Sequence, residues 1–591
     1  MHVNKFFYGL FVCATLCACS NDDVSENTPD DSPKVFTSDE AYISVRLTDA
    51  GSIQSRATTA DPGYEYGETD ECSVKNAFFY FYDANGVFVS EGSAWNGGAA
   101  STTNPAGNIE FKSKTVVALK GLTKKNYPKY MVTVLNRPDG LSNQQVPQTL
   151  AEMEKKLASD TEEGITTQVN DTRYFVMSTT SWTDQESIRP SYEKGKQTYF
   201  VTEVKEENFS LEPIAEDYAQ ITNPVTVYVE RLAAKVTLRT NLTADKAGKY
   251  YIIKATVAGS DNTGETVAAE DLYVELLGWK LNATAKSTNI VKNIDESWTE
   301  RGLGFAWNKS ADYRSFWGKS FNYGKTGYPE NAAEAAISEF LNYVNLNSGL
   351  LAVNSGIAYC PENTNTSDIV SANFPSAVTS ILLKARVCDA DGNALDLVRF
   401  NGILFNQDTF KKYILNVMKA KGQWNVWTEN GGTYTQLSDE YVKLSNVGDG
   451  KIKVELDEDK IGSTPLYANQ NNGNYAAISD KSSINTSLAT ESGDAIGYNG
   501  GLMYYNIPIE HLNNADATTD NGVTTIPEAK YGVVRNHHYV VTINKLEKIG
   551  KGIFNPEETI VPGKDDDKEA YYVGANINIL SWKIVSQNVD L

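Results

Sequence analysis

The chain has only four histidines, and this limits the catalytic schemes that its side chains can support. His2 belongs to the N-terminal leader, which leaves His511, His537 and His538. The last two are neighbours in a predicted strand, so their side chains point to opposite faces and do not share one site. A serine nucleophile needs a histidine base beside it, and so few histidines make such a site improbable. We therefore expect these histidines to be structural or surface residues.

Carboxylates are numerous, but none has the spacing of a known metal or phosphate site. The stretch DADGNALD, 389–396, resembles a calcium loop, yet Gly392 falls at its fourth place instead of its sixth, and Phe400 replaces the bidentate glutamate. A hairpin turn is the better interpretation. A second acidic group, 457–459, predicts a solvated turn, and WNGGAA lacks the lysine of a phosphate loop. We predict no enzyme, cofactor or metal site, although a glycosidase pair, defined by separation in space, stays open.

The cysteines favour lipid chemistry instead. LCAC, 16–19, resembles a bacterial lipobox in which Cys19 carries the lipid, and it follows a basic start and an apolar stretch too short to span a bilayer. The alternative is an ordinary secretory peptide. Processing would leave Cys72, Cys360 and Cys388, an odd number without the spacing of a disulfide framework or a zinc site.

Composition predicts a large, mostly β protein. The 591 residues are enough for two to four domains, and tyrosine contributes 33 residues to an aromatic content of 11%. A net charge of −22 without a basic cluster argues against nucleic-acid binding. No apolar run beyond residue 20 is long enough to span a membrane, so any membrane tie is N-terminal.

The N-terminal third contains several predicted strands. Residues 20–38 are an acidic, Pro- and Ser-rich tether. The first strand follows in AYISVRL, where four apolar residues alternate with polar ones: Ala41, Ile43, Val45 and Leu47. A hairpin is predicted in NAFFYFYDANGVFVSEG around its Asn-Gly turn, and strands in KYMVTVLN and RYFVMSTT. An amphipathic helix is expected over 146–158, with Leu150, Met153 and Leu157 on one face.

Further strands follow a domain boundary placed near residue 220. They are predicted in PVTVYVERLAAKVTLRT, KYYIIKATV, YVELLGWKL, SILLKARV and GLMYYNIPI, with one candidate helix over 332–343. A Pro-, Gly- and acid-rich linker, 556–570, then precedes a terminal strand. Its predicted residues are Val573, Ala575, Ile577, Ile579, Trp582 and Ile584.

A second short stretch, SIQSRATT at 52–59, holds Arg56 in an open Ser-, Thr- and Ala-rich loop suited to proteolysis. Cleavage between Arg56 and Ala57 would separate the tether and the first strand from the remainder. Loss of that strand would expose unpaired sheet edges, which a strand from a neighbouring molecule could fill. A plain loop arginine is the alternative.

These features together resemble the fimbrillins, the subunits of type V pili of Bacteroidia, in particular the Mfa-type major subunit. The resemblance includes the lipobox, the SRA site and the blocks FYFYDANG, VERLAAKVTL, YCPENTN, MYYNIPIEHL, GVVRNHHYVVTINKLEKIG and NINILSWKI. It implies two transthyretin-like β-sandwich domains, lipoprotein export, arginine-specific proteolysis at the cell surface and polymerisation by strand exchange. Cleavage then falls after Arg56, and the donor strand comes from the segment after Asp567.

The resulting expectation is a non-enzymatic fimbrial subunit that supports adhesion. Its expected partners are copies of itself, tip and anchor subunits, an arginine-specific surface protease and, before cleavage, the outer membrane through a lipid such as palmitate. It would be an outer-membrane lipoprotein precursor assembled into extracellular fimbriae. The alternatives are a monomeric, lipid-anchored lipoprotein that binds glycan or a host ligand, and an anchor or tip subunit.

The expected segments are a signal peptide over 1–19, a propeptide with the first strand over 20–56, an N-terminal sandwich over 57–221, a C-terminal sandwich over 222–556, and a linker with the donor strand over 557–591.

Overall fold

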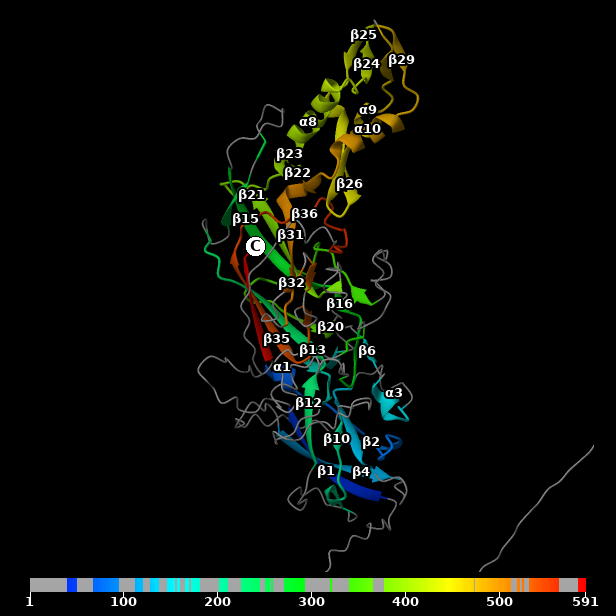
Figure 1. Cartoon of the computed structure of the whole chain (residues 1–591), viewed down its shortest axis with the longest axis vertical. Coiled ribbons are helices and arrows are strands. Elements are labelled where there is room, and N and C mark those ends of the chain that lie inside the picture. The colour runs from blue at the N-terminus through cyan, green and yellow to red at the C-terminus, as the bar shows by residue number, and fades with distance from the viewer. Residues whose placement is uncertain are drawn as a thin grey trace, which may run out of the picture.

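β-strands dominate the computed structural model, which confirms the predicted mostly β, sandwich-type fold (Figure 1). The molecule is elongated, with the N-terminal strands at one end and a smaller unit at the other. Three buried cores follow one another along this axis. The structure describes residues 40–49, 67–94, 112–120, 128–137, 146–154, 157–159, 165–169, 172–180, 201–210, 225–244, 250–255, 257–258, 270–292, 319–321, 340–364, 377–471, 473–511, 518–520, 523–525, 531–562 and 583–590.

The first core lies within a nine-stranded sheet in which β2 and β3 form the predicted hairpin. Asp83 Oδ1 accepts hydrogen bonds from the backbone N of Asn85 at 2.8 Å and of Val87 at 2.9 Å. Gly86 has a φ of 72°, which favours glycine at this turn position. The strands of this sheet are β1 (Glu40–Asp49), β2 (Ala77–Tyr82), β3 (Phe88–Ala94), β4 (Lys112–Lys120), β5 (Tyr130–Leu135), β9 (Met177–Thr180), β10 (Thr202–Glu203), β11 (Phe209–Ser210) and β12 (Val225–Arg231).

The helix expected over 146–158 is shorter than predicted. Helix α3 covers only Leu150–Glu154, where Leu150 and Met153 are buried as expected. Leu157 instead begins strand β6 (Leu157–Ser159), which pairs with β17 (Ser287–Asn289) from the second half of the chain. Pairing with a distant strand thus overrides the local helical periodicity.

The second core lies between a four-stranded and a five-stranded sheet and includes the fully buried Trp279. The first sheet contains β19 (Ile357–Pro361), β13 (Ala233–Thr240), β35 (His537–Lys545) and β37 (Lys583–Asp590). The second contains β14 (Tyr250–Ala255), β15 (Glu270–Asn282), β21 (Ser380–Cys388), β31 (Leu502–Pro508) and β36 (Lys551–Gly552). The boundary expected at residue 222 stays a prediction, and β12, which follows it, pairs in the first sheet.

A third unit is inserted between β21 and β31 and has its own core, which the sequence analysis did not separate. Helix α8 buries Phe410, Ile414, Leu415 and Met418, a helical spacing, and Asn406 caps its start by accepting from the backbone N of Asp408 at 3.0 Å. The unit contains β22 (Leu397–Phe400), β23 (Ile403–Asn406), α8 (Gln407–Ala420), β24 (Trp427–Asn430), β25 (Thr433–Gln436), β26 (Val442–Gly448), β27 (Lys451–Leu456), α9 (Glu458–Ile461), β28 (Leu466–Asn469), β29 (Tyr475–Ala477), α10 (Ser482–Ser492) and β30 (Ile496–Tyr498).

Two acidic stretches of the sequence differ in outcome. The predicted turn after β21 is confirmed, because Asp389 Oδ1 accepts from the backbone N of Asp391 and of Asn393, both at 2.9 Å. The group at 457–459 starts helix α9 instead of an open turn, and Asp457 is its N-cap.

Of the helix expected over 332–343, residues 332–339 lie outside the described part, and β18 covers Leu341–Asn342.

The remaining elements are short. They are α1 (Thr69–Cys72), β7 (Thr166–Val169), β8 (Thr172–Phe175), β16 (Thr284–Ala285), β20 (Asn363–Thr364), β32 (Thr518–Asp520), β33 (Val523–Thr525), β34 (Gly532–Val533) and the 3₁₀ turns at Glu206–Asn208, Asp439–Tyr441 and Asn499–Gly501. Within the described ranges, no helix is both long enough and apolar enough to cross a membrane.

Candidate functional site

Strand β1 occupies an interior place in the first sheet. It pairs antiparallel with β4 from Glu40 to Thr48 along one side. On its other side it pairs with β11 and then, in parallel, with β12 from Val45 to Asp49. A strand so near the N-terminus is therefore hydrogen-bonded on both edges, and its loss would separate β4 from β12.

The strands that flank β1 contribute to the first core. The predicted residues Ala41, Ile43, Val45 and Leu47 all lie in β1. The register pairs the first two with Leu119 and Val117 of β4, and the last two with Val225 and Val227 of β12. These four partners are buried, with exposed fractions between 0% and 5%. Every second position of β1 thus lies opposite a buried residue of the core.

The processing residues predicted from the sequence do not lie in the part of the chain that the structure describes. Cys19, Arg56 and Ala57 are outside the described residues, and the chain is described again from Gly67. Of the predicted terminal strand, Val573, Ala575, Ile577, Ile579 and Trp582 are also outside, whereas Ile584 lies in β37. These assignments stay predictions.

Strand β37 lies at the edge of the four-stranded sheet, parallel to β35, and ends near the C-terminus marked in Figure 1. Its register runs from Lys583 opposite His537 to Asp590 opposite Lys545. Among the described strands β37 has one partner, whereas β1 has three. Fewer ladder hydrogen bonds therefore hold the terminal strand than hold β1.

A buried ion pair lies where β12 continues into β13. Lys235 Nζ lies 2.9 Å from Glu71 Oε1, and both side chains are 2% exposed. Tyr359 donates a hydrogen bond to the same oxygen, and Arg231 Nε donates to the Glu71 backbone O at 2.7 Å. Arg231 Nη1 also reaches Asn536 Oδ1 at 2.9 Å. These contacts fix the end of β12, the strand that positions β1, against the second sandwich.

A second buried ionic group lies at the same junction. Arg535 pairs with Glu362, and both side chains are fully buried. Arg535 Nη2 donates to the backbone O of Asn289 at 2.7 Å, and Lys292 Nζ lies 3.6 Å from Glu230 Oε2. The sequence analysis missed both groups, although charged residues inside the apolar strand VERLAAK were a usable signal.

Acid is expected to weaken the junction through Glu71. Burial raises the pKa of this carboxyl, but Lys235 and Arg231 outweigh burial and hold the pKa below its usual 4.5. The folded protein therefore binds fewer protons than the unfolded chain, so the stabilisation is present above pH 4.5 and is lost as the pH falls through the folded pKa. Urea unfolding from neutral to acidic pH should show a steeper loss for the wild type than for Glu71→Gln. Parallel curves would contradict this role.

The structure places the three histidines outside the leader in the interior. All three are buried, with exposed fractions of 1% to 2%. His511 Nδ1 lies 2.8 Å from the Tyr539 hydroxyl, and its ring is 5.2 Å from that of His537. The sequence analysis did not predict that His511 and His537 meet. Among the described residues, no group of three or more His, Cys, Asp or Glu side chains is placed to hold a metal.

The cysteines of the described part are free thiols. Cys360 and Cys388 are buried, and burial raises the pKa of Cys360 to about 12, which leaves its thiol protonated and unreactive near neutral pH. Cys72 is half-buried, and its Sγ donates to the Gly67 backbone O at 3.4 Å. The sequence analysis gave these three cysteines no role, and in the structure they are packing residues.

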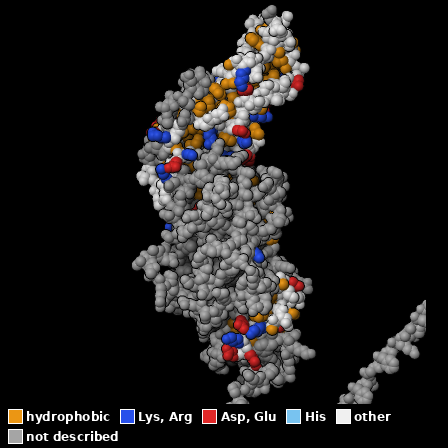
Figure 2. All heavy atoms as spheres, viewed as in Figure 1, with side chains coloured by type: hydrophobic (Ala, Val, Ile, Leu, Met, Phe, Trp, Pro, Cys, Tyr) orange, Lys and Arg blue, Asp and Glu red, His pale blue; other side chains and the backbone are white. Residues whose placement is uncertain are grey.

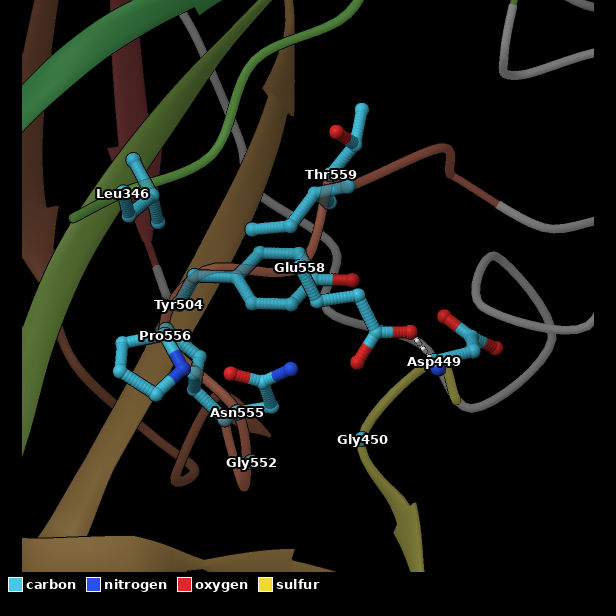
Figure 3. Close-up of a pocket in the computed structure, with 11 residues that line it drawn as sticks. Leu346, Asp449, Gly450, Tyr504, Gly552, Asn555, Pro556, Glu558 and Thr559 are labelled. Atoms are coloured by element: carbon cyan, nitrogen blue, oxygen red, sulfur yellow. Dashed lines mark hydrogen bonds between the residues drawn. The ribbon is translucent and has the colours of Figure 1, made fainter. Parts of the chain in front are cut away.

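One small cavity lies between the inserted unit and the second sandwich, with a volume of ≈ 20 Å³. Figure 3 shows Glu558 pointing toward Asp449, whose backbone N donates to the Glu558 carboxylate. Lys551 Nζ also donates to Asp449 Oδ1 at 2.6 Å. This volume is about that of a single water and far below an ordinary ligand site. The contacts serve to fasten the inserted unit.

A model of a known protein family matches the C-terminal part of the chain. Residues 497–588 match the family described as major fimbrial subunit protein type IV, fimbrillin, C-terminal. No curated protein matches the sequence. Among solved structures, a fimbrial assembly protein from Parabacteroides distasonis is 14% identical, with 60% of this chain and 84% of that chain covered and a TM-score of 0.25. The fimbrial anchor protein Mfa2 from Porphyromonas gingivalis is 12% identical, with 42% and 69% covered and a TM-score of 0.15.

Proposed function

We propose that this protein is a member of the fimbrillin family and a structural subunit of a cell-surface fimbria. The matched segment includes β31, β35 and most of β37, so it contains most of the terminal strand and the strand on which it lies. The subunit is exported as a lipoprotein on Cys19, cut after Arg56 and polymerised by strand exchange. Its partners are copies of itself, tip and anchor subunits and the processing protease.

The observation that carries this proposal is the interior position of β1. The segment 50–66, which contains Arg56, connects β1 to the strands that follow it. After cleavage, β1 is held by the ladders to β4, β11 and β12 alone. A terminal strand of a second subunit that enters this place would form the same main-chain hydrogen bonds, and its alternate side chains would complete the first core.

The terminal strand is suited to the donor role by its edge position. Its removal breaks one ladder, whereas its insertion between β4 and β12 forms two. The ten residues at 563–572 that precede the donor segment could extend over about 35 Å toward a neighbouring molecule. Donor residues are accordingly drawn from 573–584, with Ile584 already in β37.

Arg56→Ala tests the proposal in the native host. We expect wild-type protein recovered from the cell surface to begin at Ala57 and to give a ladder of heat-labile multimers on an unboiled gel. Arg56→Ala should retain the upstream segment and run as a monomer, because β1 stays in place. Lys34→Ala, which removes another basic residue of the propeptide, should behave as wild type.

The outcomes separate this function from its alternatives. A ladder from Arg56→Ala protein that still carries residues before 56 would contradict the requirement for cleavage. A lipidated Cys19 start with a single monomer band in the wild type would favour an anchor subunit or a lipid-anchored binding protein.

A further inference from the structure

The outer end of the inserted unit is a four-stranded sheet with aromatic side chains on its solvent face. The strand order is β25-β24-β28-β29, and these strands lie farthest from β1 (Figure 1). Cross-strand pairing places Trp427 opposite both Gln436 and Tyr467, and Tyr475 opposite Asn469. Because directly paired residues share one face, the aromatic residues and these amides lie together.

The opposite face of this sheet meets the third core at one end, through Leu466 of β28 and apolar residues next to the other strands. Val426, Leu437 and Leu466 belong to that core, and Ile478 packs against it. They alternate along the strands with the aromatic positions, so the aromatic face is directed away from the core. Its four aromatic residues are all partly exposed: Trp427, Tyr434, Tyr467 and Tyr475.

The aromatic rings hold one another in fixed positions. Tyr434 and Tyr475, from the two edge strands, stack with centroids 3.8 Å apart and an interplanar angle of 5°. Trp427 lies 5.4 Å from Tyr475, and Tyr467 lies 5.2 Å from Tyr434, both edge to face. Trp427 Nε1 donates to Asn425 Oδ1 at 2.9 Å, which orients the indole. Little side-chain freedom would be lost when a ligand binds to such a face.

The chemistry of the surroundings indicates an uncharged, hydrogen-bonding ligand. The segments 430–437 and 462–479 contain no charged residue, in a chain of which 22% is charged. Within the aromatic sheet Glu429 carries the sole charge, and its Oε1 accepts from the backbone N of Gly432 at 2.8 Å. Figure 2 shows hydrophobic side chains, in orange, at this end among backbone and other side chains drawn in white. The absence of Lys and Arg from these segments disfavours phosphate, sulfate or anionic lipid.

We propose that this aromatic face binds a neutral glycan, through the apolar C–H face of a pyranose ring on the aromatic rings and its hydroxyls on the neighbouring amides. Aromatic ring faces carry negative partial charge, which attracts the polarised C–H groups of a sugar. Tyrosine with Asn and Gly loops is also the composition of adaptable recognition surfaces. The inference goes beyond the fimbrial role and does not depend on polymerisation.

The test measures binding of the uncleaved Arg56→Ala chain to immobilised neutral polysaccharides: mannan, galactomannan, xyloglucan and β-glucan. A sialylated and a sulfated glycan complete the panel. We expect the wild-type face to bind at least one neutral glycan, and Trp427→Ala or Tyr434→Ala to weaken this binding at least tenfold. Val447→Ala removes an exposed apolar side chain of the same unit, 59% exposed and outside the face, and should leave binding unchanged.

A second variant separates binding from folding. Ala477 is exposed on the same face, opposite Tyr467, so Ala477→Arg obstructs the face without removing a ring. We expect it to abolish binding while the thermal unfolding curve stays that of the wild type. Failure of the wild type to bind any neutral glycan, binding confined to the charged glycans, or full binding by Ala477→Arg would each overturn the proposal. Self-association of the Arg56→Ala chain that Ala477→Arg abolishes, without glycan binding, would identify a second copy as the occupant and would also overturn the proposal.

Discussion

Protein cut after Arg56 and then freed of the segment that contains β1 is expected to lose its monomeric state. The removal leaves β4 without a partner over nine positions and β12 without its parallel neighbour, because β1 pairs with both. It also opens the first core beside Val117, Leu119 and Val227, all fully buried in the intact fold. Unpaired edges of this kind associate with any available strand.

The size of the effect follows from the area that β1 covers. Four alternating apolar side chains of these types contribute roughly 5 to 10 kcal/mol of gross free energy when a core buries them. Ordering costs reduce the net value, and yet each factor of ten in affinity requires only about 1.4 kcal/mol. A synthetic peptide of residues 38–51 added in excess should therefore re-enter the site and keep the cut protein monomeric.

The experiment starts from folded, full-length protein digested with an arginine-specific protease, so that folding precedes the loss of β1. Mild urea releases the cleaved segment, and light scattering after dilution reports the mass. We expect oligomers without the peptide and monomer with it. A peptide with Ile43→Asp and Val45→Asp, which places carboxylates opposite the buried Val117 and Val225, should not protect. Monomers in every sample would contradict the proposed role of β1.

The sequence predicted those elements whose signals are local. Strand β1 follows from simple alternation, and the β2–β3 hairpin from its Asn-Gly turn. The turn at Asp389 was likewise predicted from its residues alone. In each case the pattern that forms the element is contained within a few consecutive residues, so no knowledge of distant partners is required.

Features that depend on distant pairing were not predicted. The strand at Leu157 forms because β17 lies beside it, and the local pattern favoured a helix. The aromatic face has the same origin, since Trp427 and Tyr475 come together only through the order of the four strands. Helix α8 is different: its apolar spacing was present in the sequence and could have been found.

The buried ion pairs show most clearly why local patterns fail. Glu362 and Arg535 are far apart in the sequence, and each taken alone suggests a solvent-exposed position. In the fold both are fully buried, with Glu230 and Lys292 close by. Burial of a charge is tolerated because its partner is placed by another strand, which a single-sequence pattern does not reveal.

Glu362→Gln is expected to lower the free energy of unfolding by about 3 to 5 kcal/mol, since removal of one partner leaves Arg535 as a poorly compensated buried charge. Glu230 Oε1 lies 4.0 Å from Arg535 Nε and compensates only in part. The matched control is Asp271→Asn, which breaks the pair with Lys254, where the side chains are 47% and 70% exposed. Asp271→Asn should lower the free energy of unfolding by less than about 1 kcal/mol. Urea unfolding followed by tryptophan fluorescence, to which the buried Trp279 of the second core contributes, provides the measurement. Equal losses in the two variants would show that the buried pair does not hold the junction of the two sandwiches together.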